Sequence, residues 1–141
     1  HLVALGEAMM TAKKSGLDLA TTYEGIRISS GNSFVHETES QVILNGSRNI
    51  NFTMDLVVKD MGIFQDLADR SAIPLELSPR VLQLFRQAKS LLGERAWSPN
   101  IVMALEEACG ESLWASGFPS EIVDNEPESV GREVRVGGSA Q

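Results

Sequence analysis

The sequence predicts an all-α fold of about six helices, a six-helix bundle, and two observations support this prediction. Apolar residues recur at helical spacing over most of the chain up to about residue 116. Short loops that contain glycine, proline or a capping residue separate these helical patterns. The 141 residues are enough for one domain with a hydrophobic core. We therefore expect a helical domain over residues 1–116 and a polar tail over residues 117–141.

Three helices are expected in the first third of the chain. The first covers residues 2–14, because its leucines and methionines repeat on one helical face. Asp18 is the expected N-cap of the second helix, which ends near Gly31. Asn32 is the expected N-cap of the third helix, which ends at the Asn-Gly dipeptide that follows its last apolar residue.

Three further helices are expected in the second half. The fourth has Thr53 as its N-cap and runs to about Ser71. Ser-Pro dipeptides at residues 78–79 and 98–99 open the fifth and sixth helices, since serine can cap a helix and proline suits its first position. A glycine ends each of these two helices.

The fourth helix carries a charged pair in its apolar stripe. On a helical wheel, apolar residues on both sides lie within about 60° of Asp60, and Lys59 lies at the edge of the stripe. Burial of an unpaired carboxylate costs several kcal/mol. We therefore expect Asp60 to be buried and to face a polar group.

Composition excludes several classes of partner. The formal net charge of −7 argues against non-specific binding to nucleic acid or to an anionic membrane surface. No apolar run is long enough to span a membrane. Cys109 is the single cysteine, so it cannot form an internal disulfide, and we expect a cytoplasmic protein.

Standard catalytic and metal-binding motifs are absent from the sequence. The two histidines and one cysteine fit no zinc spacing, so no metal site is expected. The sequence has no G-x-G-x-x-G turn, no P-loop and no G-x-S-x-G elbow. Composition and periodicity alone therefore indicate a helical domain without naming its function.

Two segments resemble the C-terminal domain of the β-hydroxyacid dehydrogenase family. In "INFTMDLVVKDMGIFQDLADRSAIPLEL", the family pattern of an aromatic residue followed seven positions later by a Lys-Asp pair is matched by Phe52, Lys59 and Asp60. The family's small-x-Pro-hydrophobic turn is matched around Pro74. Upstream, "GEAMMTAKKSGLDLATTYEGIRISSGNS" is similar to the family's helix pair and its S-G-x-S turn. The resemblance covers about residues 2–110.

This resemblance implies the helical half of a two-domain enzyme, of the kind also found at the C-terminus of 6-phosphogluconate dehydrogenase. An N-terminal Rossmann domain, absent from this chain, would bind NAD or NADP. The family's catalytic lysine, in a G-x-x-x-K-x-x-x-N motif, would fall before His1. We therefore expect no catalytic residue in this chain and no activity from this chain alone.

The resemblance also assigns roles to three residues. Lys59 would contact the cofactor near its nicotinamide or ribose, and Phe52 would line the substrate cleft. Asp60 would either orient the active-site lysine region across the domain interface or cap a neighbouring helix. From the residues alone, Phe52 could instead pack at the start of the helix. Lys59 could form an ion pair with Asp55, four residues earlier, which would stabilise the helix by about 0.3–0.5 kcal/mol. The turn at residues 30–32 could line the cleft or serve only as helix caps.

The expected whole protein interconverts a small β-hydroxy acid and its semialdehyde by hydride transfer. Its partners would be its own Rossmann domain, the hydroxy-acid substrate and a second copy in a homodimer. One alternative is a non-catalytic helical domain of the same fold that dimerises or binds another protein. Another is a 6-phosphogluconate-type domain, with Arg132 and Arg135 as weak candidates for phosphate binding. The "EVRVGG" segment of the tail could form a short strand or a dimer arm.

Overall fold

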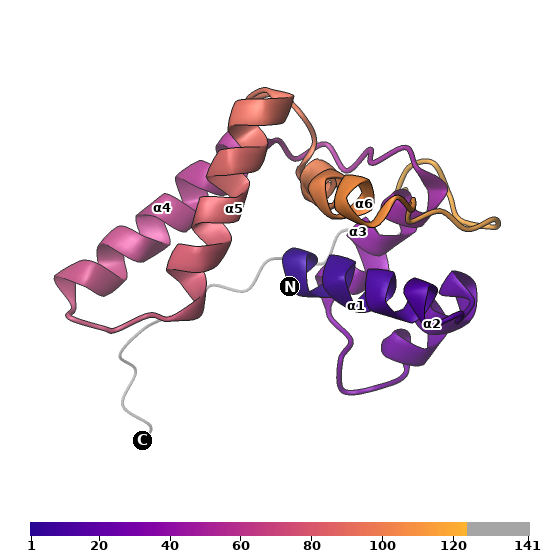
Figure 1. Cartoon of the computed structure of the whole chain (residues 1–141). Helices are drawn as coiled ribbons and strands as arrows, with labels where there is room; N and C mark the ends of the chain where they lie inside the picture. Colours follow the sequence, from indigo (N-terminus) through magenta and orange to yellow (C-terminus); the bar gives the residue numbers. More distant parts are fainter. Residues whose placement is uncertain (124–141) are drawn as a thin grey trace, which may run out of the picture.

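The computed structural model describes residues 1–123, which contain six α-helices and one 3₁₀ helix (Figure 1). The all-α prediction is confirmed. Pairing in β geometry is limited, within these residues, to two isolated bridges. The elements are α1 (Leu2–Lys14), α2 (Leu19–Arg27), α3 (Phe34–Asn45), α4 (Met54–Arg70), α5 (Leu77–Leu92), η1 (Ser98–Val102) and α6 (Met103–Cys109).

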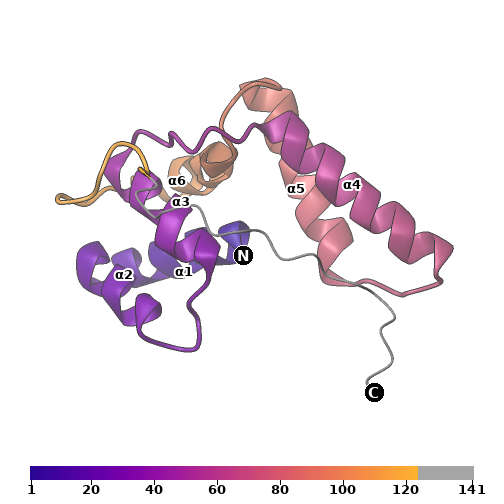
Figure 2. The same ribbon diagram turned by 180° about the vertical axis from the view of Figure 1, so that it is seen from behind.

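The helices form a body and a projecting hairpin. In the body, α1, α2, α3, η1 and α6 pack on one another. The hairpin consists of α4 and α5, which pack along each other, and α5 joins it to the body by contacting η1. Figures 1 and 2 show the turn between α4 and α5 at the free end of the hairpin, away from the body. Much of the hairpin surface therefore lacks a partner within the described chain.

The N-termini of α2 and α3 are each capped by a side-chain oxygen that accepts a backbone N–H. The Asp18 carboxylate accepts a hydrogen bond from the Thr21 N–H at 2.7 Å, as the capping pattern predicts. This bond holds the pKa of Asp18 below its usual 3.8. The prediction that Asn32 caps α3 is wrong by one residue. Ser33 is the cap, since its hydroxyl accepts from the His36 N–H at 3.1 Å.

The two Ser-Pro starts differ from the prediction. α5 already begins at Leu77, so residues 78–79 lie inside its first turn. At residues 98–99 the chain forms the 3₁₀ helix η1, and α6 begins only at Met103. Proline fits either type of helix start, because both need a φ near −65° and no N–H from this residue.

The core lies where α1, α3 and η1 meet. Met9, Met10 and Met54 are buried in it, and Met61 and Cys109 pack on its edge. α1 and η1 approach closely at Gly6. A Cβ on this glycine would lie 2.9 Å from a methyl carbon of Val102.

A buried histidine links α2 to α3. The Nε2 of His36 lies 2.9 Å from the carbonyl oxygen of Tyr23, and its Nδ1 lies 3.1 Å from the Ser40 hydroxyl. The imidazole ring also packs on the Tyr23 ring at a centroid distance of 4.5 Å. Both ring nitrogens are thus satisfied inside the core, so this histidine has a structural role.

A buried ion pair connects the loop after α3 to α6. The Arg48 guanidinium lies 2.7 Å from the Glu106 carboxylate, and the two side chains are 13% and 12% exposed. The second carboxylate oxygen of Glu106 accepts the Leu113 N–H at 2.6 Å. The pair therefore holds three segments together that are distant in sequence.

The chain after α6 runs back along α3. The Ala115 N–H donates to the Leu44 carbonyl at 2.9 Å, and the Asn45 side chain donates to the Phe118 carbonyl at 2.8 Å. The Phe118 ring meets the Tyr23 ring edge to face at 5.1 Å. The first residues of the predicted tail thus pack on the body, whereas "EVRVGG", Arg132 and Arg135 lie outside the described residues.

We predict that Arg48→Met will lower the free energy of unfolding by about 3 kcal/mol, because it leaves the Glu106 carboxylate buried without its cation. Urea denaturation measures this loss. Arg27→Met is the matched control, because Arg27 pairs with Glu24 on the exposed surface of α2 and its loss should change the free energy of unfolding much less. Equal small losses in both variants would contradict a structural role for the buried pair.

Candidate functional site

The outer face of α4 is an apolar stripe that contains the predicted charged pair. Ile63, Phe64 and Leu67 are each more than half exposed on it. The opposite face of α4 is buried, with Met54 and Ala68 as its most enclosed residues. Because α4 packs on α5, the described chain leaves the stripe open to solvent.

Lys59 and Asp60 form an ion pair on this outer face. The Lys59 ammonium lies 3.1 Å from the Asp60 carboxylate, and the two side chains are 59% and 55% exposed. The expectation that Asp60 is buried in its own domain is therefore wrong. Asp60 lies about 120° around the helix from the buried Met54, so the contact with α5 turns its carboxylate outward.

Asp55 does not pair with Lys59. Its carboxylate instead accepts a hydrogen bond from the Thr53 hydroxyl and lies 3.5 Å from the Arg95 guanidinium. The hydrogen bond from Thr53, more than the nearby arginine, holds the pKa of Asp55 below its usual 3.8. Lys59 is thus free of the i−4 pairing that the residues alone had suggested.

Phe52 lies at the root of the hairpin and is 37% exposed. Its carbonyl accepts the Ser98 N–H at 2.8 Å. The first two amides of α4 donate to the segment that follows α5, from Met54 to the Ala96 carbonyl at 2.8 Å and from residue 55 to the carbonyl of residue 94 at 3.1 Å. These bonds satisfy the free N–H groups of the helix start and fix α4 against the 94–98 segment.

The structure brings only two of the predicted site residues into contact. Lys59 touches Asp60, whereas Phe52 lies near the start of the same helix, about 10 Å from Lys59 along its axis. The turn at residues 30–32 joins α2 and α3 in the body, and the Asn32 side chain bonds to Glu37 at 2.6 Å. The proposed roles of Phe52, Lys59 and Asp60 in binding stay predictions.

A second polar contact was not predicted from the sequence. The Glu39 carboxylate on α3 is half-buried and accepts a hydrogen bond from the buried Ser98 hydroxyl at 3.1 Å. Burial raises the pKa of Glu39 above its usual 4.5. Its neighbours in the sequence, Thr38 and Ser40, are polar, so no apolar pattern in this part of α3 pointed to the contact.

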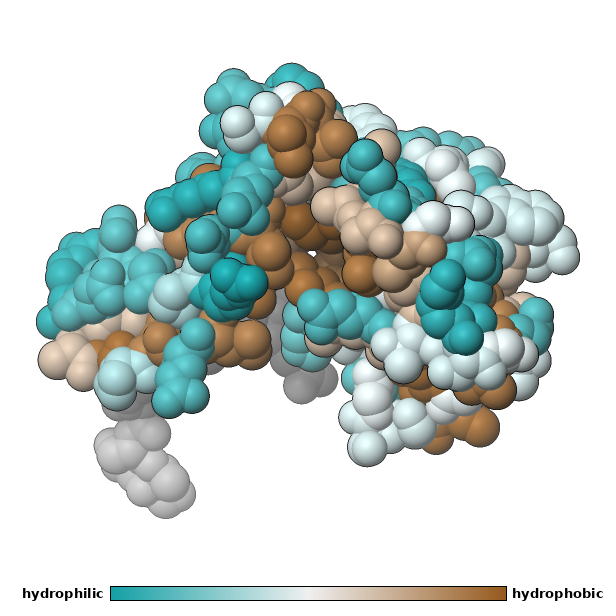
Figure 3. All heavy atoms as spheres, viewed as in Figure 1, coloured by the Kyte–Doolittle hydropathy of each residue, from teal (hydrophilic) through white to brown (hydrophobic). Residues whose placement is uncertain are grey.

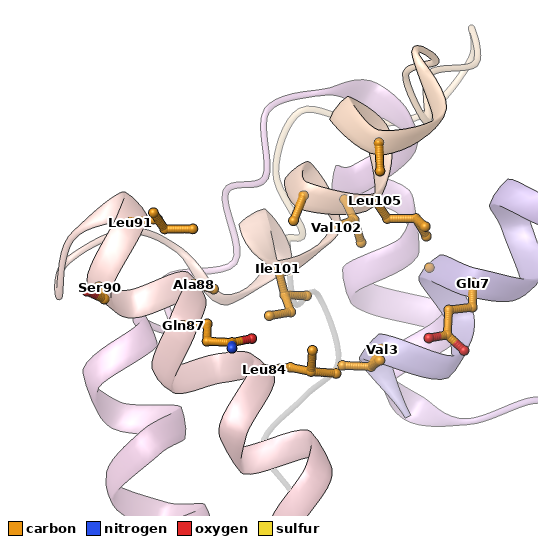
Figure 4. A pocket seen from close by; sticks show the side chains of 13 residues that line it. Val3, Glu7, Leu84, Gln87, Ala88, Ser90, Leu91, Ile101, Val102 and Leu105 are labelled. Carbon is orange, nitrogen blue, oxygen red and sulfur yellow. The ribbon is translucent and has the colours of Figure 1, made fainter.

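An apolar groove with a volume of about 600 Å³ opens between α1, α5 and the η1–α6 segment (Figure 4). Glu7 is the one ionisable residue that lines it. The space-filling view shows hydrophobic atoms along the hollow between the hairpin and the body (Figure 3). Phe52, Lys59 and Asp60 are not among the groove's lining residues.

The part of the chain that the structure describes has neither a metal-ligand cluster nor a membrane-spanning helix. Residues 1–123 contain no cluster of three or more His, Cys, Asp or Glu side chains that could hold a metal ion. Within the same residues, every helix is too short or too polar to cross a membrane.

Comparison with known proteins gives one family match. Residues 1–114 match a family model described as "NAD-binding of NADP-dependent 3-hydroxyisobutyrate dehydrogenase". The match includes Phe52, Lys59 and Asp60 and most of the described structure.

Curated relatives agree with this match. An L-threonate dehydrogenase of Cupriavidus necator is 36% identical over 90 residues, which cover 64% of this chain and 30% of the relative. An L-threonate dehydrogenase of Escherichia coli K12 is 30% identical over 90 residues, which also cover 64% of this chain and 30% of the relative. A 2-(hydroxymethyl)glutarate dehydrogenase of Eubacterium barkeri is 29% identical over 115 residues, 80% of this chain and 38% of the relative. The chain thus spans about a third of the length of these relatives.

We predict that Glu39→Gln will stabilise the protein at neutral pH. The folded pKa of Glu39 lies above its unfolded value, so its contribution to stability falls as the pH rises from about 4.5 through the folded pKa. Glutamine keeps a hydrogen-bond acceptor for Ser98 and cannot ionise. The urea midpoint should therefore rise at pH 7 and change little at pH 4.

Glu107→Gln is the control for this measurement, because Glu107 is exposed on α6. Its effect on the urea midpoint should be the same at both pH values. A loss of stability in Glu39→Gln at pH 7 would show that the charged form of Glu39 is favoured in the fold.

Proposed function

Because the chain belongs to the 3-hydroxyisobutyrate dehydrogenase-like family, we propose that it is the helical C-terminal domain of a larger NAD(P)-dependent oxidoreductase. The whole enzyme would interconvert a small β-hydroxy acid and its semialdehyde. The observation that carries this proposal is the Lys59–Asp60 pair, which matches the family's Lys-Asp motif and lies in an open apolar stripe.

The outer face of α4 would be the surface that docks on the nucleotide-binding domain. Ile63, Phe64 and Leu67 form an exposed apolar patch on it. Such patches mark surfaces that bind another domain or protein. A second domain over this face would remove water from Lys59 and Asp60. Their attraction for each other, and that of Lys59 for a bound ligand, would then grow, because the effective dielectric constant falls.

Each of the three residues would have a separate task in the closed enzyme. Lys59 would hold polar oxygen atoms of the cofactor near its nicotinamide or ribose, and Asp60 would orient the Lys59 ammonium. Phe52 would line the substrate end and help to exclude water. The cofactor, when bound, supplies the hydride acceptor or donor at nicotinamide C4. The hydroxyl proton would pass to a lysine outside this sequence.

The first substrate to test is L-threonate, although its hydroxyl β to the carboxylate is secondary, so that oxidation there would give a ketone in place of a semialdehyde. Two of the relatives are named L-threonate dehydrogenases, at 36% and 30% identity to this chain. 2-(Hydroxymethyl)glutarate is the second substrate to test. It occurs in the name of the Eubacterium barkeri relative, whose alignment covers 80% of this chain. The assay compares both acids with 3-hydroxyisobutyrate, and NAD⁺ with NADP⁺.

Further features of the whole protein belong to the same proposal. We assign residues 1–116 to the helical domain and residues 117–141 to a tail. Two copies would form a homodimer, because the hairpin has apolar faces beyond the one on α4. The single Cys109, without a disulfide partner in this sequence, supports a location in the reducing cytoplasm.

A non-catalytic helical interaction domain is the second candidate. The exposed apolar residues of the hairpin favour it. Such a surface can bind another protein even when no redox site is formed. In that case Lys59 and Asp60 would be contact residues of a protein interface, without a role in turnover.

We predict that Lys59→Ala and Asp60→Asn will each lower kcat/KM of the whole enzyme by about 10- to 100-fold, the effect of losing one charged hydrogen bond in a closed site. Reduction of NAD⁺ or NADP⁺ by the hydroxy-acid panel measures this. Circular dichroism checks that the variants are folded.

Lys89→Ala is the matched control, because Lys89 forms an ion pair with Glu94 at 3.0 Å on the same hairpin. It should leave kcat/KM unchanged. Full activity in the Lys59 and Asp60 variants would overturn the site assignment. No turnover with any acid would favour the interaction domain instead.

A further inference from the structure

Phe34 is the most exposed large hydrophobic side chain of the described residues 1–123, with an exposed fraction of 81%. It is the first residue of α3, and its two successors face inward, since Val35 packs on the core and His36 is fully buried. The Ser33 hydroxyl anchors this first turn by accepting the His36 N–H at 3.1 Å. The outward position of the Phe34 ring therefore follows from how the start of α3 is anchored.

The start of α3 lies beside the N-terminal end of α1, as two opposite views of the molecule show (Figures 1 and 2). Glu39, in the second turn of α3, gives separate evidence for this arrangement. Burial is the main cause of its raised pKa, and both the Ser98 hydrogen bond and the amino terminus of residue 1 oppose this rise. The Glu39 carboxylate is thus near enough to residue 1 for the two charges to interact.

Any segment that precedes residue 1 in the whole protein leaves from the corner formed by the starts of α1 and α3. The chain connection keeps its last residues within about 3.5 Å per residue of His1. His1 occupies the N-cap position of α1 and, within residues 1–123, its side chain caps no N–H group of this helix. Carbonyl groups of a preceding helical turn would accept the first N–H groups of α1, so a helical continuation of α1 suits this start.

We propose that Phe34 packs on the segment that directly precedes residue 1 in the whole enzyme, and thereby positions the lysine which that segment would carry. The inference rests on the proposed function, in which a lysine outside this sequence accepts the hydroxyl proton of the substrate. Phe34 acts through the packing of that segment. It is therefore a positioning residue and touches no reacting atom itself.

A tethered segment is a better occupant of this surface than a separate molecule. Its link to residue 1 holds it at a high effective concentration, whereas a second chain or another protein must be recruited from solution. The matched residues are 30% and 38% of the length of the two kinds of curated relative, so the whole enzyme would have a long chain outside this sequence. Covering the Phe34 ring removes apolar surface from water, which favours the contact.

The contact also bears on the chemistry of the lysine. A lysine in water has a pKa of about 10.4, and a proton acceptor that works near neutral pH needs a lower value. Removal of water from around the ammonium disfavours its charged form and lowers the pKa. A phenylalanine ring packed on the same segment helps to keep water out, so loss of the ring should raise the pKa of the lysine.

Photo-cross-linking of the whole protein tests the contact directly. Phe34→p-benzoylphenylalanine keeps an aromatic ring at the exposed start of α3, and irradiation links this ring to the residues that it touches. Mass spectrometry should find the link within about ten residues upstream of residue 1, a helical length of about 15 Å. Ile28→p-benzoylphenylalanine is the matched control, because Ile28 is 78% exposed at the end of α2 and should not link to this segment. A link from residue 34 to a second copy, to another protein or to no residue would overturn the proposal.

The pH dependence of turnover tests the positioning role. In the whole enzyme, Phe34→Ala should lower kcat/KM for hydroxy-acid oxidation about 10-fold, because the lysine is less well placed. The acid limb of the pH profile of kcat/KM, which reports the pKa of the proton acceptor, should move up by about half a pH unit. Phe34→Trp should restore both values, and Ile28→Ala should change neither. An unchanged pH profile in Phe34→Ala, with the variant folded by circular dichroism, would overturn the positioning role.

The two experiments separate this inference from the proposed function. A whole protein that oxidises no hydroxy acid would refute the dehydrogenase, and the cross-link would still show whether Phe34 meets the preceding segment. An active enzyme whose cross-link falls elsewhere would refute the packing of Phe34 and leave the dehydrogenase in place.

Discussion

The backbone pairing between residues 52–55 and 94–98 is the constraint on which the rest of the structure depends. Phe52, Met54 and Asp55 bond through their main chains to the segment that joins α5 to η1. The start of α4 is therefore fixed to the end of the hairpin's second helix, and both meet the body at one place. The junction sets where α4 leaves the body beside α5, and the packing of α4 on α5 then turns Asp60 outward.

The hairpin divides its apolar residues among three faces. One face holds α4 and α5 together, one lies on the outside of α4 around the Lys59–Asp60 pair, and one runs along α5 from Leu77 to Leu91. The first is covered within the described chain, whereas the outside of α4 and the two ends of the α5 face are exposed. Since the core already takes in Met54 from α4 and Phe85 from α5, the apolar residues that stay exposed on the hairpin are suited to contacts with other domains or chains. The proposed nucleotide-binding domain and second copy would use one face each.

Periodicity was sufficient to predict the helices, because each pattern is bounded by capping or breaking residues such as Asp18 and Gly46. It could not tell which apolar residues face the core. Asp60 was predicted to be buried because it lies among apolar neighbours, yet three of them, Ile63, Phe64 and Leu67, are themselves exposed in the described chain. Apolar residues that pack in a core and apolar residues that pack on another domain recur along a helix with the same period. The contact of Glu39 with Ser98 was hidden for a related reason, since no local pattern marks a bond between residues that far apart.

The central claim is that another domain covers the outer face of α4 in the whole protein. Carbene footprinting of the whole protein, with the 141-residue chain as reference, tests this claim most directly. We expect Ile63, Phe64 and Leu67 to be labelled in the 141-residue chain, where they are exposed, and to be shielded in the whole protein with NAD⁺ or NADP⁺ bound. Equal labelling of these residues in both samples would contradict it.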